Sequence, residues 1–256
     1  MIITILVDIL PKIGLIIGFF FSILPFPLLY RAIVKGDQRE IISLSIPATI
    51  LGLCCTSAVY AYCHQKALSD CVTSSYMGFA SSGLTLLTVY SLRGDFRTLL
   101  MILSLQFALV YSVNHIFKIE VTQALTLILN TLACVVGPLD TLDNLMRTRD
   151  INYMNFTMHF LALINGFIWT SYHYLNHTTS LALANALGIV CEFFLFTGCL
   201  TVTQALSPNH PVSLLTNTFL EVMFRMPKKM LQTGEVVPVK RFEEELGAKQ
   251  YREKIE

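Results

Sequence analysis

Charged side chains are scarce in this sequence of 256 residues. Asp, Glu, Lys and Arg account for 14% of the chain, whereas an average soluble domain contains about 25%. Hydrophobic residues account for 54% and the formal net charge is only +1, so no nucleic-acid partner is expected. The seven cysteines show no C-x-x-C spacing, and we therefore expect neither a metal site nor a disulfide framework.

Several motifs of pumps, enzymes and secreted proteins are also missing. The sequence contains no phosphate-binding loop of the Gly-Lys-Thr type, which argues against an ATP-driven pump. No nucleophile stands in a recognisable arrangement with a base, so neither an enzyme nor a bound cofactor is expected. No cleavable signal peptide is expected, because the first apolar stretch is short, is broken by Pro11 and runs into a longer one.

The few charges leave long uncharged stretches between them. Five stretches have 18 to 25 residues, and a sixth, between Asp150 and Glu192, has 41. A helix needs about 20 apolar residues to cross the hydrocarbon core, and the polar turn at 174–180 divides the longest stretch into two. A backbone in lipid must satisfy its own hydrogen bonds, so an all-α membrane protein follows. Its seven predicted spans are about 13–30, 43–63, 71–91, 98–117, 121–139, 156–174 and 180–204.

Positive charges are divided unequally between the two sides of the membrane. The loops on the side of the N-terminus (side A) carry three Lys or Arg residues, and those on the other side (side B) carry seven, to which the C-terminal tail adds eight. Positive loops remain on the cytoplasmic or matrix-like side. We therefore expect the N-terminus outside and the C-terminus inside.

An internal repeat organises the membrane part. Pro25 is followed 35 residues later by Tyr60, and Pro138 is followed 34 residues later by Tyr172. Each copy holds three spans, so one extra span must join the copies if they run parallel. The sequence predicts repeat one at about 13–91, a linker helix at 98–117 and repeat two at 121–204, a 3+1+3 arrangement within a domain of residues 1–204.

The remaining residues, 205–256, form a charged tail of different composition. Its last part, Arg241 to Glu256, favours a charged helix with a thin apolar edge. A basic and apolar stretch at 223–230 is suited to lying on a membrane surface.

The signatures of the second repeat resemble those of the SWEET sugar transporters, also called MtN3/saliva proteins, which are related to the PQ-loop proteins. The stretches that carry this resemblance are 137–139, 147–156, 165–172 and 184–188. The resemblance implies helices ordered first, third, second within each repeat, and transport between parallel repeats. It also implies a gate of four prolines at helix ends. Pro25, Pro47 and Pro138 fall on three of these positions, and Asn155 falls on the fourth.

The resemblance further implies a central sugar site with a Trp and an Asn from each repeat. Trp offers an aromatic face to the sugar, and Asn offers paired hydrogen-bonding groups. The second repeat supplies Trp169 and Asn185. In the first repeat the Trp position falls on Ala58, or on Val59 after a slip of one residue, and the Asn position on Ser75 or Tyr76. We include Cys54 among the substrate-binding candidates; Tyr60, Tyr62 and Tyr76 are candidates for a substitute aromatic wall.

An ionisable residue, Glu192, stands inside the last predicted span, where the family has a small residue. Such residues are costly in a bilayer and face the bundle interior. Glu192 lies seven residues after Asn185, two helical turns along nearly the same face. One interpretation is a proton-sensitive gate or a partner for His159 in the preceding span; the other is a protonated or hydrogen-bonded structural group.

Two functions of different class fit these features. The first is a facilitator in the plasma membrane or an endomembrane that moves a small polar solute, a mono- or disaccharide, by alternating access. The second is a non-transporting structural subunit of a larger complex, for example in the mitochondrial inner membrane. Half of the sugar site is lost and the tail is long, which supports the second as an alternative, while the facilitator remains the first interpretation. Residues 206–256 would then bind the other subunits, or a second copy of the chain.

Overall fold

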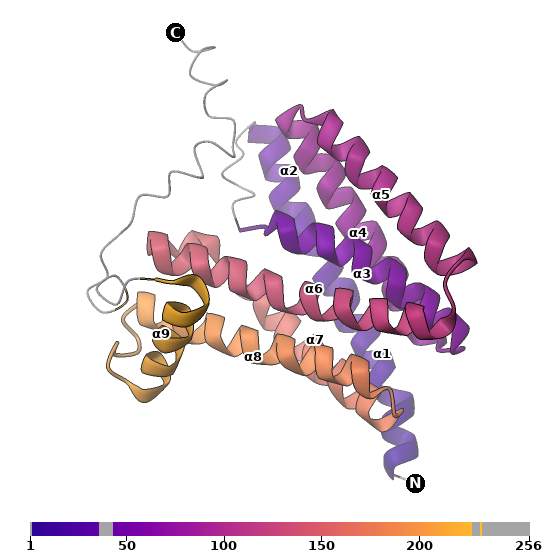
Figure 1. The fold of residues 1–256 in the computed structure, drawn as a ribbon. Coiled ribbons are helices and arrows are strands. Elements are labelled where there is room, and N and C mark those ends of the chain that lie inside the picture. Colours follow the sequence, from indigo (N-terminus) through magenta and orange to yellow (C-terminus); the bar gives the residue numbers. More distant parts are fainter. Residues whose placement is uncertain (1, 36–42, 227–230, 232–256) are drawn as a thin grey trace.

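The protein is a bundle of helices in the computed structural model, which describes residues 2–35, 43–226 and 231 (Figure 1). No strand occurs in these described ranges, so the predicted all-α class is confirmed. The helices are α1 (Ile2–Ile23), α2 (Pro25–Lys35), α3 (Ile46–Gln65), α4 (Ser69–Arg93), α5 (Phe96–His115), α6 (Ile119–Thr148), the short 3-10 helix η2 (Ile151–Tyr153), α7 (Phe156–Leu175), α8 (Thr179–Val202) and α9 (Pro211–Phe224).

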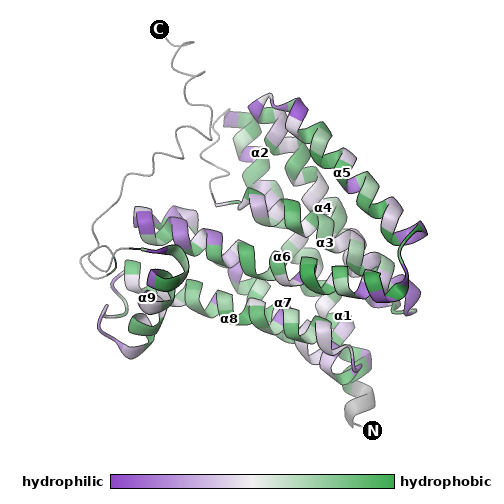
Figure 2. Ribbon diagram, viewed as in Figure 1, coloured by the Kyte–Doolittle hydropathy of each residue, from purple (hydrophilic) through white to green (hydrophobic). Residues whose placement is uncertain are grey.

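The seven predicted spans correspond to α1 with α2, and then to α3 through α8. Five of them are long and apolar enough to cross a membrane by composition: α1 with α2, α3, α5, α6 and α8. The other two, α4 and α7, are long enough, with 25 and 20 residues, but contain more polar side chains. Figure 2 shows hydrophilic residues near the helix ends and mainly hydrophobic residues along the middle of the bundle.

Two helix bounds differ from the prediction, and both differences involve proline. Pro11 was expected to break the first apolar stretch, but it lies inside α1, which begins at Ile2. Pro138 likewise lies inside α6, which continues to Thr148, well beyond the predicted end at 139. A membrane helix tolerates proline because its neighbours satisfy the freed backbone groups. The first span is instead interrupted at Leu24, between α1 and Pro25, the first residue of α2.

Six helices form a closed ring. Within repeat one, α4 packs between α1 and α3; within repeat two, α8 packs between α6 and α7. Both repeats therefore have the expected order of first, third and second helix. The ring is completed by α3 against α6 and by α1 against α7. These two contacts are equivalent under a two-fold relation between the repeats, as a parallel repeat requires.

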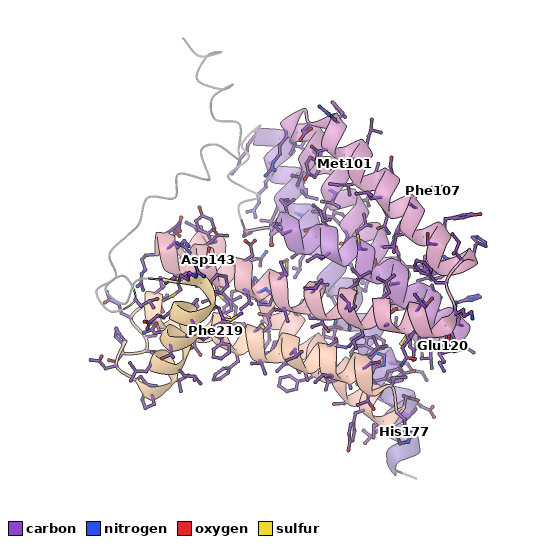
Figure 3. All side chains as sticks on the ribbon, viewed as in Figure 1. Met101, Phe107, Glu120, Asp143, His177 and Phe219 are labelled. Atoms are coloured by element: carbon purple, nitrogen blue, oxygen red, sulfur yellow. The ribbon has the colours of Figure 1, made fainter. Side chains whose placement is uncertain are left out.

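The linker helix α5 lies outside this ring, against α3 and α4 of repeat one. Its attachment is polar: the buried side chain of Gln106 donates hydrogen bonds to the Leu53 carbonyl, at 3.2 Å, and to the Ser57 hydroxyl of α3. The opposite face of α5 is apolar, and Met101 and Phe107 point outward (Figure 3), with Phe107 74% exposed. Such a face is suited to lipid.

The region expected to be a separate charged tail begins instead with a packed helix. Leu220 of α9 is fully buried with Met226 and Leu231 in a cluster that also contains Leu142 of α6 and Leu195 of α8. The Phe219 ring stacks on Phe194 at 4.6 Å between α9 and α8 (Figure 3). The helical core therefore extends at least to residue 226. The predicted helix at 241–256 and the second half of the stretch 223–230 lie outside the described residues.

This packing predicts that two truncations differ in stability. Deletion of residues 206–256 removes Leu220 and Met226 from the buried cluster. These two side chains are 0% and 1% exposed. Loss of one large buried side chain costs about 2–5 kcal/mol. We expect a lower midpoint of thermal aggregation for this variant, measured by size-exclusion chromatography after heating in detergent. Deletion of only residues 232–256 is the control and should leave the midpoint near that of the full chain; equal midpoints for both truncations would contradict the packing.

Candidate functional site

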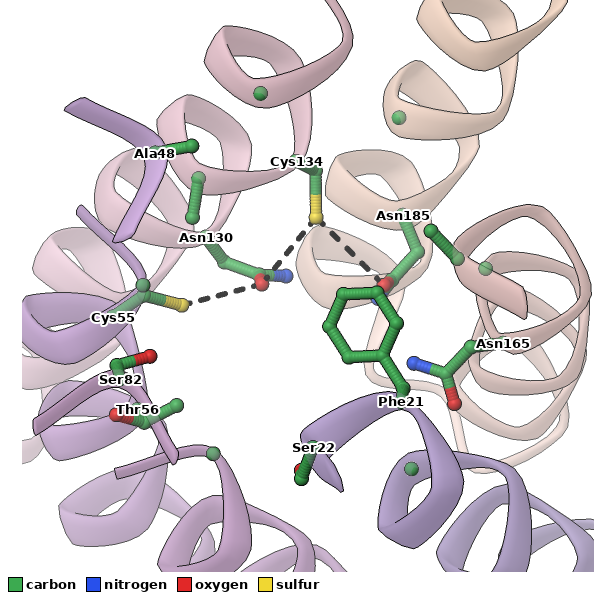
Figure 4. A pocket seen from close by; sticks show the side chains of 18 of the residues that line it. Phe21, Ser22, Ala48, Cys55, Thr56, Ser82, Asn130, Cys134, Asn165 and Asn185 are labelled. Carbon is green, nitrogen blue, oxygen red and sulfur yellow. Dashed lines mark hydrogen bonds between the residues drawn. The ribbon is translucent and has the colours of Figure 1, made fainter. Parts of the chain in front are cut away.

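A cavity of about 370 Å³ lies inside the helical ring, between the two repeats (Figure 4). Its volume is within the range of small-molecule sites, roughly 300–1,000 Å³. All six helices of the ring line it, together with Pro25 of α2 and the residues just before α3. The linker helix α5 and the tail helix α9 contribute no lining residue. A solute in this cavity would therefore contact both repeats at once.

Helix α4 presents a face of small polar residues to the cavity. The lining residues of this face are Cys71, Ser74, Ser75, Gly78, Ser81, Ser82 and Thr85. They recur every three or four residues, the spacing of one helix face. Ser75 donates to the Cys71 carbonyl at 2.8 Å and Ser81 donates to the Ser22 carbonyl of α1 at 2.8 Å, so these hydroxyl donors are satisfied in the low dielectric. This face explains why α4 is more polar than the other spans.

Trp169 of α7, the only tryptophan of the chain, stands at one end of the cavity. Its indole Nε1 donates to Asn165 Oδ1 at 3.0 Å, and its ring lies 5.7 Å from His173 in a stacked arrangement. The ring also belongs to a buried cluster with Tyr62, Cys63, Cys71, Tyr172 and Leu181, of which Cys71 and Leu181 line the cavity. That cluster joins α3 and α4 to α7 and α8, so it closes the cavity toward side A.

Polar side chains from α3, α6 and α8 contact one another across the middle of the cavity (Figure 4). The thiols of Cys55 and Cys134 donate to Asn130 Oδ1 at 3.4 and 3.7 Å. Asn185 donates its amide to the Leu181 carbonyl at 2.8 Å, and its Oδ1 lies 4.0 Å from the Cys134 sulfur. The carboxamides of Asn130, Asn165 and Asn185 thus stand around one space and offer both donors and acceptors.

Glu192 and His159 meet at the other end of the cavity, as their positions in the sequence suggested. The His159 Nδ1 lies 3.1 Å from both carboxylate oxygens of Glu192. The two side chains are only 4% and 6% exposed. Both residues line the cavity. The interpretation of His159 as the partner of Glu192 therefore has the geometry it needs.

The structure brings together most of the residues singled out from the sequence. Trp169, Asn185, Ser75, Pro25, Pro138, His159 and Glu192 all line the cavity. Cys54 and Ala58 do not line the cavity. In each case the next residue of α3 lines it instead: Cys55 after Cys54, and Val59 after Ala58. One residue along a helix turns the side chain by about 100°, so the slip to Val59 is the better register.

The remaining gate candidates lie just outside the lining. Pro47 stands in the first turn of α3, beside the lining residue Ala48, and Ser45 accepts from the Ala48 N–H at 3.3 Å. Asn155 is the N-cap of α7, as Ser45 is of α3, and its Oδ1 accepts from the Met158 N–H at 3.1 Å. Asn155 is therefore a helix cap where the family has proline.

The candidates for a substitute aromatic wall do not line the cavity. Tyr60 and Tyr76 hydrogen-bond to each other at 3.3 Å, with Tyr76 59% exposed, and Tyr62 is buried in the cluster behind Trp169. Two other contributors to the site, Asn130 and Asn165, were not assigned from the sequence, although Asn165 begins one of the matching stretches. A polar residue within a predicted span was the available signal, because such residues usually face the bundle interior.

Comparisons with known proteins agree with this architecture. Residues 121–198 match the sequence profile of a family described as sugar efflux transporters for intercellular exchange, MtN3/saliva. Among solved structures, a eukaryotic SWEET transporter matches with a TM-score of 0.63 and 13% sequence identity, over 78% of this chain and 99% of that chain. No curated protein sequence matched the chain.

The chain therefore shares the helical fold of that solved structure, with two three-helix repeats joined by a linker helix. The predicted resemblance to the SWEET family is confirmed, by sequence over the second repeat and by fold over the membrane part.

The contact between α1 and Trp169 yields a test of the site geometry. A Cβ at Gly14 would lie 3.0 Å from Trp169 Cε2 and 3.1 Å from Cζ2, so Gly14→Ala should push the indole out of its apolar cluster. We expect the emission of the single tryptophan to move to longer wavelength. Gly18→Ala, one turn along, meets nothing closer than the Ser74 hydroxyl at 3.9 Å and should leave the emission unchanged. Identical spectra for all three proteins would show that Gly14 does not pack on Trp169.

Proposed function

We propose that this protein is a facilitator that moves a mono- or disaccharide across a membrane by alternating access, without ATP. The observation that carries the proposal is a cavity between two parallel three-helix repeats, whose lining includes carboxamides, hydroxyls and an indole. Two repeats whose main contacts are α3 against α6 and α1 against α7 are able to rock against each other around a fixed central site. The sequence similarity of the second repeat to sugar efflux transporters supports a sugar as the solute.

The lining is suited to a sugar in both of its chemical aspects. A sugar ring has apolar C–H faces, for which the Trp169 indole supplies an aromatic surface. Its hydroxyls both donate and accept hydrogen bonds, and carboxamides do the same. The Asn165 Oδ1 is already engaged with Trp169, which leaves its amide hydrogens for the solute. Asn130 likewise uses its Oδ1 for two thiols and has its amide nitrogen available.

Two prolines support a hinge on the side B end of the cavity. Pro25 begins α2 after the break at Leu24, and Pro138 lies within α6, and both line the cavity. They occupy matching positions in the two repeats. A missing backbone hydrogen bond makes a helix easier to bend at that place. The distribution of Lys and Arg supports side B as the cytoplasmic side, with the N-terminus outside.

The alternative of a non-transporting subunit has less support. Neither comparison points to an accessory subunit or to mitochondria. The first part of the segment that would bind other subunits, 211–226, packs on helices of the same chain. Any assembly through the tail would have to use the exposed face of α9, such as Val222 and Met223, or residues beyond 231.

The proposal predicts which substitutions reduce sugar uptake. In proteoliposomes, the parent should take up labelled hexose or disaccharide, and Trp169→Ala, Asn185→Ala and Asn130→Ala should each slow the initial rate. Loss of one hydrogen bond or aromatic contact of about 1–3 kcal/mol corresponds to roughly a 5- to 150-fold loss of affinity. Asn185→Ala tests a residue that the family resemblance implies, and Asn130→Ala tests one that only the structure identified.

Matched controls lie on the linker helix. Asn114→Ala removes an exposed asparagine whose amide donates only to the Val110 carbonyl, and Phe107→Ala removes an outward-facing aromatic ring. Both should transport like the parent. A parent without uptake of any tested sugar would refute the proposed function. Normal uptake by all three cavity variants would refute the assignment of the site.

A further inference from the structure

The His159–Glu192 pair is the one strongly charged element in the cavity. Among its lining residues, Glu192 is the only carboxylate, and none is a lysine or arginine. The pair is almost completely buried, and His159 Nε2 has no hydrogen-bond partner among the described residues. The lining residue Thr85, 2% exposed, likewise has an unpartnered hydroxyl. Sugar recognition by Trp169 and the asparagines does not explain these groups.

No other residue of the cavity lining is a carboxylate, a lysine or an arginine. The other ionisable residues of the lining are the thiols Cys55 of α3, Cys71 of α4 and Cys134 of α6, and the imidazole of His173 of α7. Cys191 precedes Glu192 on α8, and the lining residues of α1 are not ionisable. The carboxylates of Asp140 and Asp143 on α6 and of Glu221 on α9 do not line the cavity. An ionised Glu192 beside a neutral His159 would therefore leave one negative charge that no other lining residue compensates.

We propose that His159 and Glu192 form a proton-binding site whose occupancy controls the closing of the cavity, so that the protein is a proton-gated facilitator. Exclusion of water penalises an uncompensated charge far more strongly than a paired one. One added proton converts neutral histidine and carboxylate into an imidazolium–carboxylate pair with no net charge. Closure of the cavity around the pair thus accompanies proton uptake. Nδ1–H donates to Glu192, and the protonated Nε2 becomes a second donor.

The expected direction of the pH effect on transport rests on the proposed function. If transport needs a closed intermediate, the initial rate of transport should increase as the pH falls, because the cavity closes more readily around the protonated pair. Removal of the Glu192 charge should imitate the loaded state. Removal of His159 should leave a lone carboxylate, which must be protonated itself before the cavity closes.

The test compares uptake at pH 5.5 and 7.5, equal on both sides of the membrane, for the parent and three variants. The parent should be faster at pH 5.5 by about threefold or more. Glu192→Gln should be fast and insensitive to pH, and His159→Gln should be slower than the parent at pH 7.5 while remaining sensitive to pH. Glu120→Gln, which removes an exposed carboxylate at the start of α6, is the control and should follow the parent. A pH-insensitive parent, or a Glu192→Gln variant with the parent's pH dependence, would overturn the proposal.

A second measurement needs no solute and separates the two proposals. Trp169 stands where the repeats meet, so a change between open and closed cavity should alter quenching of its emission by acrylamide. In the parent, the quenching constant should differ between pH 5.5 and 7.5, and in Glu192→Gln it should not. His173 stacks on Trp169 but is retained in the variant, so its own influence cancels in the comparison. If no sugar is transported but this difference is found, the proton site stands and the proposed solute fails; if parent and variant behave alike, the proton site is wrong.

Discussion

The contact of α3 with α6, together with its counterpart between α1 and α7, holds the two repeats together and encloses the cavity. In lipid, helices gain little from hydrophobic burial against each other, so close packing and hydrogen bonds must hold them. At this contact Thr126 donates to the Ala58 carbonyl at 3.1 Å and Cys55 donates to Asn130 at 3.4 Å. The second of these bonds lies in the lining of the cavity, so a contact that joins the repeats also borders the site. A rearrangement that opens the cavity must exchange these bonds for others.

Much of the fold was predictable from the distribution of charge. Uncharged stretches of helical length gave the spans, and matched prolines in two of them gave the repeat. The helix ends were less predictable. Pro11 and Pro138 would end a helix in water, but in a bundle within lipid the helix continues through them. The packed helix α9 was missed because its apolar residues, such as Leu220, are followed by a highly charged sequence that dominated the composition of the tail.

The candidate site was predictable where helical spacing alone determines which residues share a helix face. Glu192 lies two turns after Asn185, and His159 lies one turn after Asn155, and the structure pairs the two ionisable residues as this spacing suggested. The first repeat was harder, because no motif fixes its register there. A slip of one residue separates Ala58 from Val59, and only the packing of α3 against α6 shows that Val59 faces the cavity. Asn130 belongs to no signature, and its role depends on thiols from two other stretches of the chain.

The two repeats make unequal contributions to the cavity, and this inequality bears on the mechanism. Repeat two supplies the indole, the three carboxamides and the ionisable pair, whereas α4 of repeat one supplies small side chains such as Ser74, Gly78 and Ser82. A solute would gain most of its directional contacts from repeat two and meet a smooth, weakly polar wall on the other side. Such a wall makes few directional contacts to be broken when it moves. The loss of the Trp and Asn positions in repeat one is thus compatible with a division of roles, in which repeat two holds the solute and repeat one opens and closes over it.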